Sequence, residues 1–239
     1  MLVHNQSHTT PNIIPAPQLP SEDTGLVWAA DVQSQKDAFE ILDQIRDCVT
    51  MVKIGHILLW ACGVEILSQI KATYRIPILA DPKLCDVPHF VGIATSILYQ
   101  AGADGVMVAG IAGEETIRTA VEADRRRMVF VFTEFTHGSG LIEPEMADDC
   151  ATIAHEVGAY GIQAPGTRPD RIRRLRHVVG PRMKILACGL GCQGGGLGTA
   201  VAAGANYEIV GRLITDASNP RAVAELAQSR LVQAAVDRE

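Results

Sequence analysis

The sequence predicts a single (β/α)8 barrel, the TIM-barrel class of α/β fold. Eight short apolar runs alternate with helix-like stretches from residue 25 onward. Most of the runs are apolar at consecutive positions, which is typical of parallel strands that are buried on both faces. Eight β-α repeats in about 215 residues are the number that closes a barrel. No linker interrupts the repeats, so we predict one catalytic domain over residues 25–239 behind a flexible tail over residues 1–24.

The elements follow in order along the chain. The expected strands are Leu26–Val32, Met51–Leu59, Ile76–Ala80, Gly105–Ala109, Met128–Phe135, Tyr160–Ala164, Lys184–Cys188 and Glu208–Val210. Ser34–Val49 has the apolar spacing of a helix with Ser34 as its N-cap, and Asn219–Leu231 has Pro220 near its first turn. Glycines at positions suited to helix ends precede four of the strands, namely Gly102, Gly158, Gly180 and Gly204.

A doubly wound open sheet is the structural alternative. That fold usually has fewer strands and a glycine-rich turn after the first one. Here the first strand is followed by Asp31-Val32-Gln33-Ser34, which contains no glycine. The barrel is therefore favoured, and it places the chemistry at the C-terminal ends of the strands.

Composition narrows the class of protein. A net charge of -6 argues against nucleic acid or an anionic membrane as the main partner. No window has the roughly 18 apolar residues of a membrane span, and the first residues lack the pattern of a secretory signal. Six scattered cysteines fit reduced thiols and lack the spacing of a zinc site. We therefore expect a cytoplasmic protein without a zinc site.

Charged residues interrupt the apolar runs at or near strand ends. Asp31 follows the first strand, Lys53 lies within the second, and Asp81, Lys83 and Asp86 follow one another at the end of the third. Because side chains two apart on a strand point to the same face, we expect Asp81 and Lys83 to project together. Buried charges must pair or serve a ligand. An ion-pair network that only holds the barrel together is the alternative to a catalytic array.

A second group of residues indicates a phosphate site. The glycine-rich segment Gly189–Gly196 follows the seventh strand, and Gly211-Arg212 follows the eighth. Barrels frequently bind phosphate between these two loops, through backbone N–H groups and cationic side chains. A flexible turn beside a surface arginine is the alternative. The run Arg125-Arg126-Arg127, by contrast, is most simply a solvated cluster at a helix C-terminus.

The run from Asp81 to Pro88 resembles the D-x-K-x-x-D signature of the orotidine 5'-monophosphate decarboxylase suprafamily. Pro165-Gly166-Thr167-Arg168-Pro169 resembles the family's P-G-T-R-P loop, and residues 191–195 resemble its G-x-Q-G-G loop. Sugar-phosphate members of the suprafamily usually have an acidic residue on the second strand. Lys53 resembles the nucleotide decarboxylases instead.

The resemblance implies a reaction and a role for each matching residue. The family converts orotidine 5'-monophosphate (OMP) to UMP and CO2 without a cofactor. Lys83 would protonate the ring carbon C6, Asp81 would oppose the departing carboxylate, and Asp86 would act from the neighbouring subunit of a homodimer. Lys53 and Asp31 would contact the ribose and hold the array in register.

The remaining matching positions would bind the substrate. Thr136 and Cys188 would lie beside the base, Gln193 would bridge base and phosphate, and Arg212 would hold the phosphate. Glycines complete the set at Gly194, Gly195 and Gly211. Arg168 is expected to fix its loop rather than to bind phosphate. Segments 138–144 and 189–196 are the candidate moving loops.

Some positions depart from the family pattern. Phe90 stands where a small polar residue is usual, Cys188 where proline is usual, and Thr136 where serine is commoner. Two alternatives therefore stay open. One is a related reaction on another nucleotide or a sugar phosphate, as in 3-keto-L-gulonate 6-phosphate decarboxylase or hexulose 6-phosphate synthase. The other is a non-enzymatic barrel that senses nucleotides.

Overall fold

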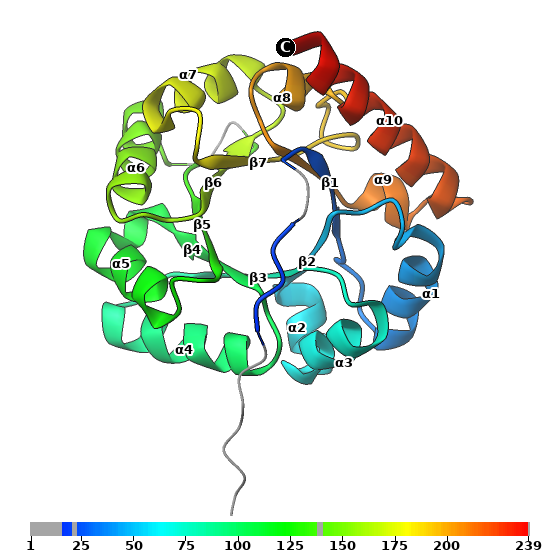
Figure 1. Ribbon diagram of the computed structural model, residues 1–239, viewed down its shortest axis with the longest axis horizontal. Coiled ribbons are helices and arrows are strands. Elements are labelled where there is room, and N and C mark those ends of the chain that lie inside the picture. The colour runs from blue at the N-terminus through cyan, green and yellow to red at the C-terminus, as the bar shows by residue number, and fades with distance from the viewer. Residues whose placement is uncertain (1–15, 21–22, 138–140, 239) are drawn as a thin grey trace, which may run out of the picture.

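The computed structural model describes residues 16–20, 23–137 and 141–238. Within these residues, eight parallel strands close into a barrel in sequence order, with β1 paired to both β2 and β8. Helices surround the barrel as an outer ring (Figure 1). The predicted barrel is confirmed, and the open sheet is excluded because no strand edge is left between β8 and β1.

The strands are short and buried. They are β1 Gly25–Ala29, β2 Met51–Gly55, β3 Ile78–Leu84, β4 Gly105–Ala109, β5 Met128–Phe132, β6 Gly161–Pro165, β7 Lys184–Cys188 and β8 Tyr207–Val210. The helices are α1 Gln35–Ile45, α2 His56–Cys62, α3 Glu65–Tyr74, α4 Pro88–Gln100, the 3-10 turn η1 Gly110–Ala112, α5 Glu114–Ala123, α6 Pro144–Glu156, α7 Pro169–Val179, α8 Thr199–Ala202, α9 Arg212–Thr215 and α10 Pro220–Arg238. Among the described helices, none combines the length and the apolar character that crossing a bilayer requires.

Local signals in the sequence set several helix ends as expected. The Ser34 hydroxyl accepts a hydrogen bond from the Asp37 N–H at 3.1 Å, and α10 begins at Pro220. The four glycines before strands have positive φ, between 69° and 114°. The expected strands Leu26–Val32 and Met128–Phe135 continue past the observed ends at Ala29 and Phe132. The largest error is the expected strand Met51–Leu59, which divides into β2 and helix α2 at Gly55. Consecutive apolar residues suit a buried strand and a buried helix equally, so the run carried no signal for this change.

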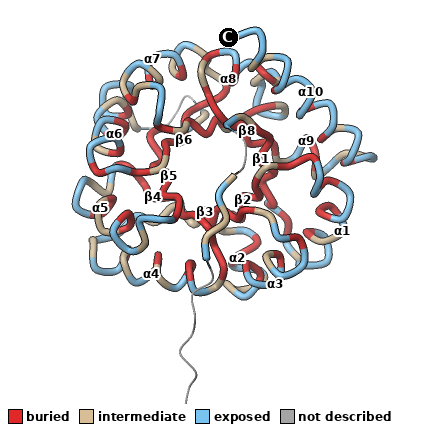
Figure 2. Tube along the Cα trace, in the orientation of Figure 1, coloured by how far each residue is buried: buried red, intermediate tan, exposed pale blue. Residues whose placement is uncertain are grey.

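Alternate strand residues form two separate cores. Residues such as Leu26 and Trp28 face outward and pack against the helices, whereas Val27, Phe130 and Phe132 face the barrel axis. Figure 2 shows the resulting ring of buried strands inside partly exposed helices. The inward-facing side chains fill the barrel interior toward the N-terminal ends of the strands. A ligand can therefore enter from the C-terminal ends of the strands.

The N-terminal end of the barrel is covered by part of the expected tail. The Gln18 N–H donates to Asp104 Oδ1 at 2.7 Å, and Lys71 Nζ lies 2.6 Å from Asp104 Oδ2. Asp23 Oδ1 lies 2.5 Å from Lys184 Nζ at the start of β7. The described residues before β1 thus cross the barrel mouth opposite the loops that carry chemistry (Figure 1). The flexible tail expected over residues 1–24 stays a prediction, and residues 1–15 and 21–22 lie outside the described part.

The expected solvated arginine cluster is wrong at one position. The Arg127 side chain is only 1% exposed. Its guanidinium lies 4.8 Å from the Tyr99 ring centroid, donates to the Ala103 carbonyl and pairs with Asp124 at 3.2 Å. Arg126 is exposed, and its Nε and Nη2 donate to the two carboxylate oxygens of Asp124. Arg127 directly precedes Met128, the first residue of β5, so its side chain is buried at the start of the strand and is not solvated at the end of α5.

Candidate active site

A cavity of about 350 Å³ lies at the C-terminal ends of the strands. Its walls include side chains from β1, β2, β3, β5, β6, β7 and β8 and the loops after them. Nine of the twelve predicted site residues line it, namely Asp31, Lys53, Asp81, Lys83, Thr136, Cys188, Gln193, Gly211 and Arg212. The prediction that the barrel mouth gathers these residues is therefore confirmed for most of them.

Four charged side chains form an alternating row along one wall. Asp81 is 3% exposed, and its carboxylate lies 2.9 Å from Lys83 Nζ and 3.2 Å from Lys53 Nζ. Lys53 Nζ lies in turn 3.5 Å from Asp31 Oδ1. The four charges cancel, which lowers the cost of burying each of them. Among the described residues, no group of three or more His, Cys, Asp or Glu is arranged to hold a metal ion.

The backbone brings Lys83 to Asp81 by an irregular route. The register of β3 against β4 shifts between Ala80 and Leu84, and Lys83 has a left-handed φ of 51°. Regular strand alternation correctly predicted that Lys83 lies beside Asp81, but it did not predict the left-handed backbone at Lys83. A left-handed conformation is rare for a residue with a side chain and persists only where surrounding structure enforces it. Here both Asp81 oxygens accept from Lys83 Nζ at 2.9 Å.

Lys53 is held as a cation by its neighbours. Burial by itself lowers the pKa of Lys53, but the carboxylates of Asp81 and Asp31 more than offset this, so its pKa lies above the ordinary value. A glycine makes room for the pairing. A Cβ added at Gly55 would lie 2.8 Å from Asp31 Oδ1 and 3.2 Å from Lys53 Nζ. Gly55 therefore both ends β2 and leaves space for the Asp31–Lys53 ion pair.

The cavity floor is apolar. Lys83 Nζ lies 5.4 Å from the centroid of the Phe132 ring, and that ring packs edge-on against Phe135 with centroids 4.7 Å apart. The Cys188 Sγ lies 3.7 Å from the Ala164 carbonyl oxygen. Burial raises the pKa of the Cys188 thiol to about 12, against the opposing effect of Lys83. Cys188 is thus a neutral wall residue at physiological pH, not a nucleophile.

The glycine-rich loop after β7 is closed by its own hydrogen bonds. The N–H of Gly191 donates to Gly195 O at 2.7 Å, that of Gly194 to Gly191 O at 2.9 Å, and that of Gly195 to Gly189 O at 3.2 Å. These three amides shape the loop, and the substrate contacts expected of Gly194 and Gly195 stay a prediction. Gly194 and Gly195 do not line the cavity described above. The Arg212 side chain does line it from the following loop.

Two loops meet over the cavity through the predicted base-binding residue. The Thr136 hydroxyl lies 2.6 Å from Gln193 Oε1, which joins the loop after β5 to the loop after β7. Thr167 Oγ1 lies 3.3 Å from the Thr136 carbonyl, so the loop after β6 joins the same cluster. Of the expected moving segments, 138–140 lies outside the described residues.

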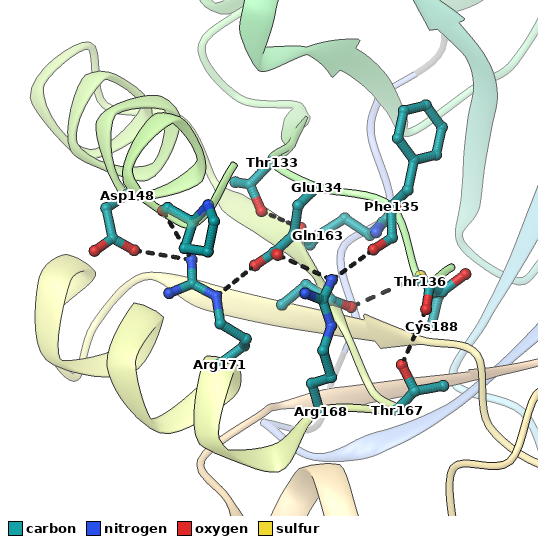
Figure 3. A network of polar contacts seen from close by, with 12 residues as sticks. Thr133, Glu134, Phe135, Thr136, Asp148, Gln163, Thr167, Arg168, Arg171 and Cys188 are labelled. Carbon is teal, nitrogen blue, oxygen red and sulfur yellow. Dashed lines mark hydrogen bonds and ion pairs between the residues drawn. The ribbon is translucent and has the colours of Figure 1, made fainter. Parts of the chain in front are cut away.

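Beneath this contact lies a buried ionic network (Figure 3). Glu134 is 1% exposed and pairs with Arg168 Nη2 and Arg171 Nε, each at 2.9 Å. Arg171 also pairs with Asp148 of α6 at 3.0 Å, and Arg168 Nη2 donates to the Phe135 carbonyl at 2.7 Å. Arg168 therefore fixes the segment that carries Thr136. These contacts agree with the expectation that Arg168 fixes its loop.

Asp86 lies apart from the other predicted catalytic residues. It is exposed, its Oδ1 accepts from the Val87 N–H at 2.7 Å, and it does not line the cavity. It directly precedes α4, whose exposed side includes Phe90, at 57% exposure, and Ile93. Within one chain, Asp86 has no place in the site.

Several cavity residues were missed by the sequence analysis. They are Ala29, Phe132, Phe135, Gln163 and Ile209. Most are apolar and carry no signal that distinguishes a cavity wall from core. Gln163 did carry one, because it is a lone polar residue in the apolar run from 160 to 164, as Lys53 is in its own run.

Comparison with known proteins decides the family. The family model described as orotidine 5'-phosphate decarboxylase / HUMPS matches residues 24–227, which is nearly the whole barrel. The chain belongs to this family. Its relatives include orotidine 5'-phosphate decarboxylases from Methanosarcina mazei, 34% identical over 86% of this chain and 94% of that protein, and from Pyrococcus horikoshii, 37% identical over 84% and 95%.

Solved structures of the decarboxylase family have the same fold. The enzyme from Pyrococcus horikoshii superimposes with a TM-score of 0.81 at 34% identity, covering 87% of this chain and 99% of that one. The enzyme from Methanocaldococcus jannaschii, complexed with the inhibitor BMP, gives a TM-score of 0.82 at 28% identity, covering 87% and 98%. The similarity thus extends over the whole barrel of each enzyme.

Proposed function

We propose that this chain decarboxylates OMP to UMP and CO2, with Lys83 as the proton donor. One observation carries the proposal. Lys83 Nζ is held 2.9 Å from a buried carboxylate in the same cavity that Arg212 lines. A cation positioned for chemistry thus shares one cavity with a cation suited to phosphate.

The charge row explains how decarboxylation proceeds without an added cofactor. The substrate carboxylate lies beside Asp81 and is opposed by its charge, while the ring carbon that it leaves gains negative charge next to Lys83. Because Lys53 also pairs with Asp81, Lys83 can turn toward the ring carbon without leaving Asp81 unpaired. The ammonium stabilises the charge that develops in the transition state more than it stabilises the ground state.

Phosphate binding orders the loops after β5 and β7, which lie over the charge row. Arg212 holds the phosphate, and Gln193 lies between it and the base. Because Gln193 contacts Thr136, closing the loop after β7 positions the loop after β5 as well. Binding energy from the phosphate is in this way used to exclude water from the reacting carbon.

A homodimer would complete the site. Asp86 lies outside its own cavity and directly before α4, where Val87, Phe90, Ile93 and Ile97 are each at least 47% exposed. A large exposed apolar patch marks an interaction surface. Pairing two copies through this side of α4 would carry Asp86 of each copy toward the partner's cavity, where it would add a second carboxylate beside Lys83.

The sugar-phosphate alternative is not favoured. The relatives named above are orotidine 5'-phosphate decarboxylases, and Lys53 replaces the acid that the sugar-phosphate members use. A requirement for magnesium, lost on addition of a chelator, would favour that alternative. For the nucleotide reaction, we place the protein in pyrimidine nucleotide synthesis in the cytoplasm.

The test follows the loss of orotate absorbance with purified protein. Wild type should turn over OMP, and Lys83→Ala should lower the rate by at least about a hundredfold, since both the proton donor and its charge are removed. Lys184→Ala is the matched control, because it removes an ammonium at the opposite end of the barrel. Absence of turnover by wild type above the Lys83→Ala level would refute the proposal.

The same variant tests the shared site. Lys83→Ala and Asp86→Asn should each be nearly inactive alone. After the two are unfolded and refolded together, a mixed dimer has one site with both wild-type residues and should regain activity. Recovery of no activity, with dimers confirmed by light scattering, would contradict the assignment of Asp86 to the partner's site.

A further inference from the structure

Gln163 lies in the middle of β6 with its side chain turned toward the barrel axis. Its strand neighbours Ile162 and Ala164 belong to the outer core, so alternation directs Gln163 inward. It pairs in register with Phe132 on β5 and with Leu186 on β7, both of which belong to the inner core. It is 3% exposed and lines the cavity. A neutral amide thus occupies an inner position otherwise surrounded by apolar groups.

One end of the Gln163 side chain is buried without a partner among the described residues. Within the described residues, its Nε2 is buried and makes no hydrogen bond. A buried amide donor without an acceptor is unfavourable, and such groups are rare in folded proteins. A half-turn about the terminal side-chain bond exchanges Nε2 with Oε1, so the donor can face the cavity. An acceptor on a bound ligand would satisfy this group.

The position of Gln163 indicates which ligand atom it meets. Phe132 pairs with Gln163 across β5 and β6, and the Nζ of Lys83 lies over the Phe132 ring, 5.4 Å from its centroid. In the closed barrel, β6 lies opposite β2, so Gln163 faces the charge row across the cavity. A group bound between Lys83 and the floor therefore lies between the charge row and this amide.

We propose that Gln163 is a specificity-determining residue whose amide donates a hydrogen bond to the carboxylate of the substrate. The inference rests on the proposed function, in which that carboxylate is attached to the carbon that Lys83 protonates. A site that satisfies a buried donor only with the correct ligand discriminates against analogues that lack the acceptor. UMP lacks the carboxylate, so Gln163 favours substrate over product.

This contact acts on binding more than on chemistry. The carboxylate carries its full charge in the ground state and loses it as CO2 forms, so the hydrogen bond weakens along the reaction. Removing an interaction of this kind raises KM without lowering kcat. A residue that only held the barrel together would alter the thermal stability and the affinities for OMP and UMP together.

The experiment compares Gln163→Leu with wild type. Leucine keeps similar bulk and removes the donor and the unpaired polar atom. KM for OMP should rise roughly tenfold to a hundredfold, as expected for loss of a hydrogen bond to a charged group. Because that hydrogen bond is weaker in the transition state, kcat should stay level or rise and should not fall. The dissociation constant of UMP, measured by calorimetry, should change by less than about twofold, and Tm should not fall.

Gln163→Glu supplies a second variant with nearly the same shape. The glutamate carboxylate should repel the carboxylate of OMP. Gln163→Glu should therefore weaken OMP binding more than Gln163→Leu does, and it should weaken OMP binding more than UMP binding. Equal weakening of OMP and UMP by both variants, with wild-type turnover intact, would overturn the role of Gln163 and leave the proposed function standing. If wild type neither binds nor turns over OMP, both fail.

Discussion

Arg168 and Arg212 are two arginines near the cavity with different predicted roles, and a matched pair of variants separates them. Arg168→Met removes the guanidinium that pairs with Glu134 at 2.9 Å and donates to the Phe135 carbonyl at 2.7 Å. Arg212→Met removes a side chain that lines the cavity. Methionine keeps much of the bulk of arginine, so the charge and its hydrogen bonds are the main loss in both variants.

The magnitude for Arg168 follows from its surroundings. At 2.9 Å the direct Coulomb energy is about 6 kcal/mol in a medium with a dielectric constant near 20. The Arg168 side chain is 40% exposed, so solvent screens much of this, and Arg171 remains on Glu134. We expect a net loss of about 1 to 2 kcal/mol in the free energy of unfolding, or roughly 2 to 8 °C in Tm. Arg212→Met should leave Tm within about 2 °C.

Ligand titrations complete the comparison. Arg212→Met should weaken UMP about tenfold to a hundredfold and leave uridine, which lacks the phosphate, unaffected. Arg168→Met loosens the segment that carries Thr136, so it should weaken UMP and uridine by the same factor. If Arg168→Met weakened only UMP and kept the wild-type Tm, Arg168 would be a phosphate ligand and the buried network would not have the role described here.

Two further variants test the charge row and the cavity wall. Gly55→Ala puts a Cβ 2.8 Å from Asp31 Oδ1, and the half-exposed Asp31 should swing away from Lys53. Displacing Asp31 should raise the transition-state barrier by about 1 to 2 kcal/mol, so kcat/KM should fall roughly fivefold to thirtyfold. Tm should change little, because the Asp31 side chain of this 3.5 Å pair is half-exposed and such pairs contribute little to stability. An unchanged rate would show that the Asp31–Lys53 pair is dispensable. Burial raises the pKa of Cys188 to about 12, so iodoacetamide at pH 8 should alkylate the exposed Cys192 and spare Cys188 in mass spectra. The raised pKa favours the folded protein below pH 9, and this contribution should fade as pH rises from 9 toward 12. Rapid labelling of Cys188 at pH 8 would contradict its raised pKa.

The fold was largely predictable because its signals are local and repeated. Gly105–Ala109 and Lys184–Cys188 were predicted with their observed bounds, since each is an apolar run bounded by polar residues and turns. Boundaries failed where apolar residues continue through a change of structure, as at Gly55 between β2 and α2. Arg127 was misplaced because sequence neighbours alone did not show that it packs on Tyr99.

The site was predictable where charges interrupt strands, and less so where geometry depends on tertiary contacts. Lys53 and Asp81 stood out because burying a charge needs a partner. Nothing in the sequence indicated that Gly194 and Gly195 use their amides within the loop. Gln163 stood out by the same rule as Lys53 but was overlooked, because a neutral amide in an apolar run is a weaker anomaly than a charge.

The left-handed backbone at Lys83 limits how this position can be redesigned. A φ of 51° is tolerated by glycine and asparagine, whereas most other residues lose about 1 to 2 kcal/mol there, and β-branched ones more. A library that replaces Lys83 in search of new chemistry would therefore be biased by main-chain strain before any catalytic effect is measured. Asparagine or glycine at residue 83 is the fairer baseline for such a screen, because either removes the amine without forcing the bulge in β3 to rearrange.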